Sequence, residues 1–177
     1  MTQQYHKNSK IIHWLMAVVI IGLLGSGVFM ANFIAGDASY RGDVYHIHKS
    51  FGVVALFLII IRVINRIKNT PPTLPESIKK IEQTLAHIGH NALYALMLLM
   101  PLSGYLMSNS YGYQVKLFSI TMPDLVAKNY DLGAIFSGAH QYLGYLMVAV
   151  LVAHIAGALK HRYFDENKEN DVLKRIT

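Results

Sequence analysis

One apolar run carries the two residues around which the sequence is organised, and it reads AHQYLGYLMVAVLVAHIAGALKH over residues 139–161. His140 and His154 stand fourteen residues apart within it. An α-helix advances about 1.5 Å and turns about 100° per residue, so His154 returns to the face of His140 about 21 Å further along the axis. No Asp or Glu lies between Asp131 and Asp165. The run therefore predicts a membrane-spanning helix with two histidines on one face, near opposite edges of a hydrocarbon core about 30 Å thick.

Two histidines at two depths of one helix favour two stacked cofactors. Imidazole is a common axial ligand of haem iron, and a haem needs an apolar cleft between helices. The alternatives for His140 and His154 are a packing role or a proton relay. We interpret this helix as one that supplies an iron ligand to each of two haem sites.

The composition supports a membrane protein, since 53% of the 177 residues are hydrophobic and only 15% are charged. The chain has no cysteine, which excludes thiolate-bound iron–sulfur clusters, blue-copper sites and covalently attached haem. Any haem is then a non-covalent haem b with histidine ligands. The net charge of +6 comes from basic residues that flank the apolar runs, so we expect membrane lipid and no nucleic acid as a partner.

We expect a single domain over residues 1–177, an all-α bundle of four transmembrane helices with a charged C-terminal tail at 160–177. The spans are predicted at residues 11–34, 48–67, 85–107 and 136–159. The N-terminus, the second connection and the tail hold twelve Lys and Arg residues, and the other two connections hold four. The positive-inside rule therefore places both termini in the cytoplasm. Arg62 and Arg66 are expected to reach the lipid headgroups at the end of the second span.

This topology sorts the histidines into two layers. The outer layer contains His48 and His140, with His46 as a competitor that points away from His48 by roughly 200° on a helix. The inner layer contains His13, His154, His87 and His90, with His161 lower still. Two bis-histidine haems follow from this sorting, although a histidine at a helix start, such as His13 or His48, is often merely interfacial.

Three further histidines, His87, His90 and His161, are expected near the inner layer. His87 and His90 lack a nearby carboxylate to complete a metal site. With His161 they predict the polar end of a quinone pocket, where an imidazole can hydrogen-bond a carbonyl and exchange protons near neutral pH. The alternative is that all three are interfacial histidines without a ligand.

Five segments in this order resemble the bacterial cytochrome b561 family: Ile12-His13-Trp14-Leu15, His48-Lys49-Ser50-Phe51-Gly52, Leu85-Ala86-His87-Ile88-Gly89-His90, Leu117-Phe118-Ser119-Ile120-Thr121-Met122-Pro123, and His140 with His154 and His161. The resemblance implies a four-helix di-haem b cytochrome of the bacterial inner membrane. It implies His13, His48, His140 and His154 as the iron ligands, in agreement with the two layers.

The resemblance also implies two candidate activities. The best understood member of the family is a superoxide oxidase, which takes an electron from superoxide at the periplasmic face and passes it through the haems to ubiquinone. The same fold occurs as an electron-transfer subunit of hydrogenases and formate dehydrogenases, which would make this chain a carrier between a partner, such as a periplasmic redox protein, and the quinone pool. A non-redox bundle whose histidines bind a metal or nothing is the third alternative.

The outer connections supply cations for the first of these activities. Superoxide is a small anion, and a cationic rim raises its local concentration. Lys49 adjoins His48, and Lys116 lies in the third connection. We expect Lys49 and Lys116 to steer superoxide; the alternatives are pairing with haem propionates and ordinary surface charge.

Overall fold

Four long helices make up most of the protein in the computed structural model, which describes residues 4–177. They are α1 (Lys7–Asn32), α2 (Arg41–Lys68), α3 (Lys80–Ser110) and α4 (Tyr130–Tyr163). Each is long and apolar enough to cross a membrane, which confirms the predicted all-α fold with four spans. Each helix begins before its predicted span, and α2, α3 and α4 also continue past the predicted end, because polar residues continue the helical hydrogen bonding outside the hydrocarbon. The first span is the exception at its far end, since α1 ends at Asn32 and not at the predicted residue 34. At the start of α4, for example, the Asn129 side chain accepts from two backbone N–H groups of the first turn.

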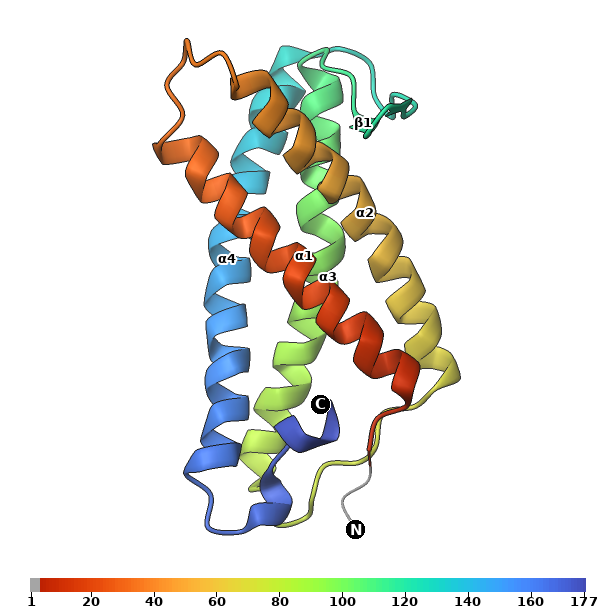
Figure 1. Ribbon diagram of the computed structural model, residues 1–177, viewed down its shortest axis with the longest axis vertical. Coiled ribbons are helices and arrows are strands. Elements are labelled where there is room, and N and C mark those ends of the chain that lie inside the picture. Colours follow the sequence, from red (N-terminus) through yellow and green to blue (C-terminus); the bar gives the residue numbers. More distant parts are fainter. Residues whose placement is uncertain (1–3) are drawn as a thin grey trace.

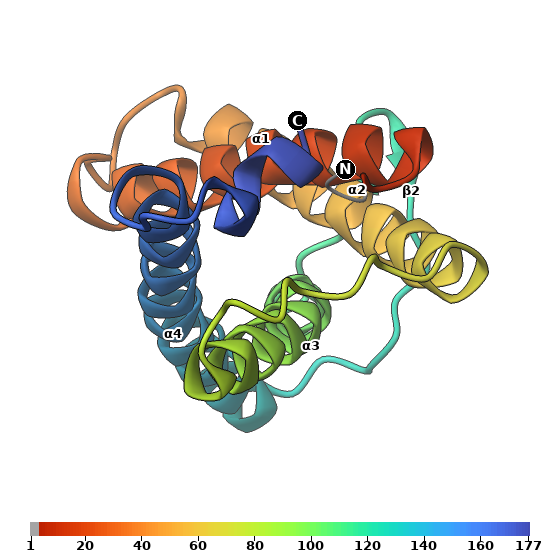
Figure 2. The same cartoon turned by 90° about the horizontal axis from the view of Figure 1, so that it is seen from below.

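The helices form two packed pairs (Figures 1 and 2). α4 runs along α3, α1 crosses α2, and α2 joins the pairs by also packing on α3. The largest buried cluster draws on all four helices and consists of Met16, Ile20, Ala55, Ile59, Leu93, Leu96, Met97 and Met147. Many large apolar side chains point outward instead, as expected for a bundle whose surface faces lipid tails.

A short hairpin closes the end of the bundle that carries His48 and His140, which is called the outer end after the predicted topology. Its strands are β1 (Lys116–Leu117) and β2 (Ile120–Thr121), paired antiparallel. The Ser50 hydroxyl in α2 donates to the Lys116 carbonyl (2.9 Å) and accepts from the Phe118 N–H (3.0 Å). The fully buried Ser50 therefore fixes the hairpin beside His48.

The C-terminal tail folds back over the opposite end, beside the first half of α1 (Figure 1). It contains two 3₁₀ turns, η1 (Lys168–Asn170) and η2 (Leu173–Arg175). The Trp14 indole N–H donates to the Ile176 carbonyl (3.0 Å), and the buried Arg175 donates to the Thr73 carbonyl (2.7 Å). The tail thereby ties the start of α1 to the connection between α2 and α3.

Candidate haem sites

Two pairs of histidines face each other inside the bundle. The ring centres of His48 and His140 are 6.4 Å apart, and those of His13 and His154 are 6.3 Å apart. A metal–imidazole bond is about 2 Å, and the nitrogen lies about 1.1 Å from the ring centre, so two imidazoles on opposite sides of one iron have centres about 6 Å apart. Both pairs have this spacing, and α4 supplies one member of each. The four histidines predicted as ligands therefore fit two bis-histidine haems.

In the outer pair, the His48 ring is held in the metal-binding tautomer. Its Nδ1 lies 2.7 Å from the Ser26 hydroxyl oxygen, and that hydroxyl donates its own proton to the Leu23 carbonyl (3.0 Å). Ser26 must therefore accept from His48, which places the ring proton on Nδ1. Nε2 keeps its lone pair free for iron.

The His140 ring is oriented in the same way from α3. Nδ1 lies 3.0 Å from the Met100 carbonyl oxygen and 3.1 Å from the Ser103 hydroxyl. Because a carbonyl only accepts, Nδ1 carries the proton and Nε2 is again free. The ring packs directly on Gly104, where a Cβ atom would lie only 2.9 Å from the His140 Cε1. Gly104 is therefore required by the position of this ring.

An arginine that was predicted to lie at the headgroups contacts the inner pair instead. Arg62 was expected to reach the headgroups, but it is half-buried and donates to His13 Nδ1 (Nη2, 3.0 Å) and to the Tyr94 hydroxyl (Nε, 3.2 Å). The expectation is wrong because His13 and Tyr94 offer acceptors nearer than the headgroups, and a guanidinium in a span turns to the polar groups within reach. In this arrangement His13 Nδ1 accepts, since a guanidinium can only donate.

The remaining histidines are placed differently from one another. His90 lies beside His154, with ring centres 5.4 Å apart, and so belongs to the inner layer. His87 is exposed on α3, the helix that also carries His90. His161 Nδ1 lies 2.8 Å from an Asp165 carboxylate oxygen. The structure thus places His90 against the inner pair, whereas His161 contacts Asp165 in the tail.

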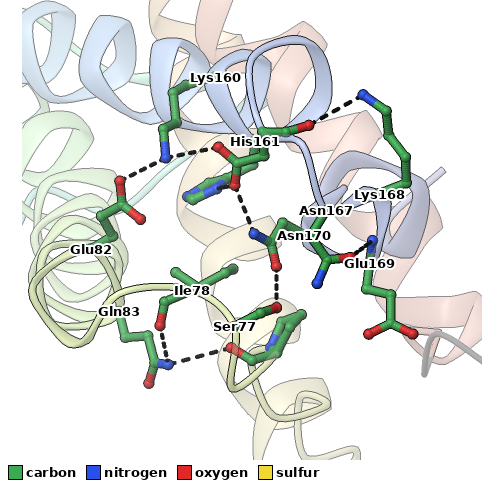
Figure 3. Close-up of polar contacts among 12 residues, drawn as sticks. Ser77, Ile78, Glu82, Gln83, Lys160, His161, Asn167, Lys168, Glu169 and Asn170 are labelled. Carbon is green, nitrogen blue, oxygen red and sulfur yellow. Dashed lines mark hydrogen bonds and ion pairs between the residues drawn. The ribbon is translucent and has the colours of Figure 1, made fainter.

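A polar cluster that includes Glu82, Lys160, His161 and Asn170 lies where the tail meets α3 and α4 (Figure 3), and Asp165 contacts the last three of these residues. The Lys160 ammonium bridges Glu82 (2.7 Å) and Asp165 (2.9 Å), and Asn170 donates to Asp165 (2.9 Å). Hydrogen bonds from Lys160 and His161 hold the pKa of the Asp165 carboxyl well below its usual range. This cluster anchors the tail to the helices, and no periodicity in the sequence indicated it.

The two predicted steering lysines lie at one outer corner. The Lys49 ammonium donates to the Gln114 carbonyl (3.2 Å), and the Lys116 carbonyl accepts from Ser50, the residue after Lys49. Lys116 is exposed. The structure thus brings both residues to the hairpin beside His48.

Sequence reasoning missed four residues that contact the paired histidines, and they are Ser26, Arg62, Ser103 and Gly104. The two serines carried a usable signal, because a hydroxyl inside an apolar span needs a partner within the bundle. Gly104 carried none, because a glycine in a span also serves ordinary helix packing.

Comparison with known proteins places these sites in a family context. The family model described as prokaryotic cytochrome b561 matches residues 4–175. Cytochrome b561 homolog 2 of Escherichia coli K12 is 33% identical over 181 residues, covering 98% of this chain and 91% of that protein. A protein named "Probable superoxide oxidase CybB" from Yersinia pestis is 29% identical over 166 residues, covering 93% and 91%. Cytochrome b561 homolog 1 of Escherichia coli K12 is 21% identical, covering 98% and 97%.

Proposed function

Because the chain belongs to the prokaryotic cytochrome b561 family of haem b membrane electron-transfer proteins, we propose that it is a di-haem superoxide:ubiquinone oxidoreductase of the bacterial inner membrane. The observation that carries the proposal is the two histidine pairs, each with ring centres spaced for one iron. His48 and His140 would hold the periplasmic haem, and His13 and His154 would hold the cytoplasmic haem. Both termini are cytoplasmic in this orientation.

The overall reaction balances with the partners named. Each superoxide loses one electron and becomes dioxygen, whereas ubiquinone takes up two electrons and two protons and becomes ubiquinol. Two superoxide ions are therefore oxidised for each quinone reduced. The bound haems supply one-electron carriers at two depths of the membrane.

At the outer end, the chain attracts the substrate and orients the ligands. Lys49 and Lys116 add positive charge beside His48, which raises the local concentration of a small anion. Ser26 and the Met100 carbonyl hold the ring protons of His48 and His140 on Nδ1, so that each Nε2 would offer a lone pair to iron.

At the inner end, the chain handles protons. His90 lies against His154, where an imidazole can hydrogen-bond a quinone carbonyl. His161 is oriented by the Asp165 carboxylate, and exposed His87 lies one helical turn before His90. We assign the three histidines to proton delivery from the cytoplasm to the quinone.

The name of the Yersinia pestis relative supports superoxide as the substrate. The test is stopped-flow mixing of the purified, oxidised protein with superoxide while the haem absorbance is followed. We expect rapid haem reduction that superoxide dismutase abolishes, and reoxidation when a soluble ubiquinone analogue is added.

Haems that dithionite reduces but superoxide does not would refute the substrate assignment. The chain would then be an electron-transfer subunit or carrier between a partner dehydrogenase or periplasmic redox protein and the quinone pool. Haems that superoxide reduces but the quinone analogue leaves reduced would refute the acceptor instead.

A further inference from the structure

Two arginines on adjacent turns of α2 share one aromatic ring. The guanidinium carbon of Arg62 lies 5.5 Å from the centre of the Tyr94 ring, and that of Arg66 lies 5.2 Å from it. Both side chains are half-buried. Within residues 4–177, the ion pairs lie elsewhere and neither guanidinium has a carboxylate oxygen within 4.0 Å.

This arrangement lacks an anion. Like charges four residues apart on a helix repel each other, and cations inside a span ordinarily pair with an opposite charge. The guanidinium is the side chain best shaped to bind a carboxylate, through two parallel hydrogen bonds. The Tyr94 hydroxyl accepts from Arg62 (3.2 Å) and still has a proton of its own to donate.

Iron binding at His13 sharpens the need for this anion. Arg62 now donates to His13 Nδ1 (3.0 Å), which requires the ring proton to sit on Nε2. When Nε2 ligates iron, the neutral ring carries its proton on Nδ1. Two donors would then face each other, and Arg62 has to turn to another acceptor.

We propose that Arg62 and Tyr94, reinforced by Arg66 on the next turn, bind a carboxylate of the inner haem. The proposal rests on the proposed function, in which His13 ligates that haem. Haem b carries two propionate groups, so the cofactor itself brings an anion to a place where residues 4–177 supply no carboxylate within 4.0 Å. The carboxylate would relieve the repulsion between the arginines and replace His13 as the acceptor for Arg62.

The site has a redox consequence that a merely structural arginine would not have. Reduction adds one negative charge to the haem, and a cation held at its carboxylate stabilises that charge. Arg62 therefore raises the midpoint potential of the inner haem, and removing its charge lowers that potential.

The experiment is a spectroscopic redox titration of the haem-loaded protein and its R62Q variant. We expect R62Q to lower the midpoint potential of one haem and to leave the other unchanged, and R62K to restore part of the loss. R41Q is the matched control, because Arg41 also lies over a tyrosine ring (Tyr45, 5.3 Å) but at the outer end; its inner haem potential should equal that of the wild type. Y94F should lower the midpoint potential of the inner haem by a smaller amount. It provides the test if R62Q does not fold.

Two outcomes would overturn the carboxylate site, and a third would refute the proposed function. Two haems with unchanged potentials in R62Q and Y94F would overturn the inference and leave the proposed function intact. A shift seen in vesicles of phosphatidylglycerol but not of phosphatidylcholine would also overturn it, because the anion would then be a lipid phosphate. A wild-type protein without haem would refute the proposed function itself.

Discussion

Replacing Gly104 by alanine tests how the outer haem site is built. The added Cβ would lie 2.9 Å from the His140 Cε1 and 3.1 Å from its Nδ1, whereas ordinary contact begins at 3.4 Å. The ring has to move by about 0.5 Å to recover that contact. It cannot do so freely, since the same Nδ1 is bonded to the Met100 carbonyl at 3.0 Å and to the Ser103 hydroxyl at 3.1 Å.

The expected magnitude follows from two opposing effects. Alanine in a helix interior is about 1 kcal/mol more favourable than glycine, and overpacking a filled site costs about 1–3 kcal/mol. Gly138 provides the matched control, because it also lies in a helix and a Cβ there would meet nothing within 4 Å. G138A has only the favourable effect of alanine on the helix, so G104A should be less stable than G138A by about 1–3 kcal/mol, the cost of overpacking. If the clash displaces His140 from the position of an iron ligand, a free-energy difference of this size weakens the binding of the outer haem by about one to two orders of magnitude.

The assay is haem quantification per chain, combined with a redox titration, for the wild type, G104A and G138A. We expect G104A to lose haem from one site selectively during dilution, while G138A retains both. Two haems with wild-type affinity and potential in G104A would refute the claim that His140 is held against Gly104 as a ligand.

Three other predictions address the remaining parts of the account. S26A removes the acceptor for His48 Nδ1, which makes the ring a weaker electron donor and should raise the midpoint potential of the outer haem; an unchanged or lower potential would contradict the assigned tautomer. The folded pKa of Asp165 is lowered, so its carboxylate stabilises the folded tail above about pH 4 and loses this effect as the pH falls through the folded pKa. Thermal unfolding should therefore show D165N below the wild type at pH 7, with the gap closing in acid; a gap independent of pH would argue against the ion pairs. The double variant K49Q/K116Q should slow superoxide-driven haem reduction more at low salt than at high salt, and equal ratios at every ionic strength would remove steering.

The four spans were predictable because long apolar runs have few alternatives to membrane helices. The direction of each span places its histidines in one of two layers, which separates His48 and His140 from His13 and His154. Depth alone leaves His87 and His90 in the inner layer with the second pair. The ring spacings in the structure agree with the pairing of His48 with His140 and of His13 with His154. These features depend on patterns that repeat along a single segment.

The rest depends on contacts between distant polar groups, which leave no periodic trace. The bond from Trp14 to the Ile176 carbonyl joins two residues at opposite ends of the sequence, and neither residue type indicates the other. Arg62 illustrates the same difficulty, because an arginine near the end of a span can reach outward or turn to an inner acceptor. Only the neighbouring His13 and Tyr94 decide between the two directions.

The central claim, that α4 supplies one ligand to each of two haems, is tested most directly by counting haem in H140A and H154A. We predict two b-type haems per chain in the wild type, loss of one spectral component in H140A, and loss of the other component in H154A. A wild-type protein that binds a single haem, or two variants that lose the same component, would contradict the account.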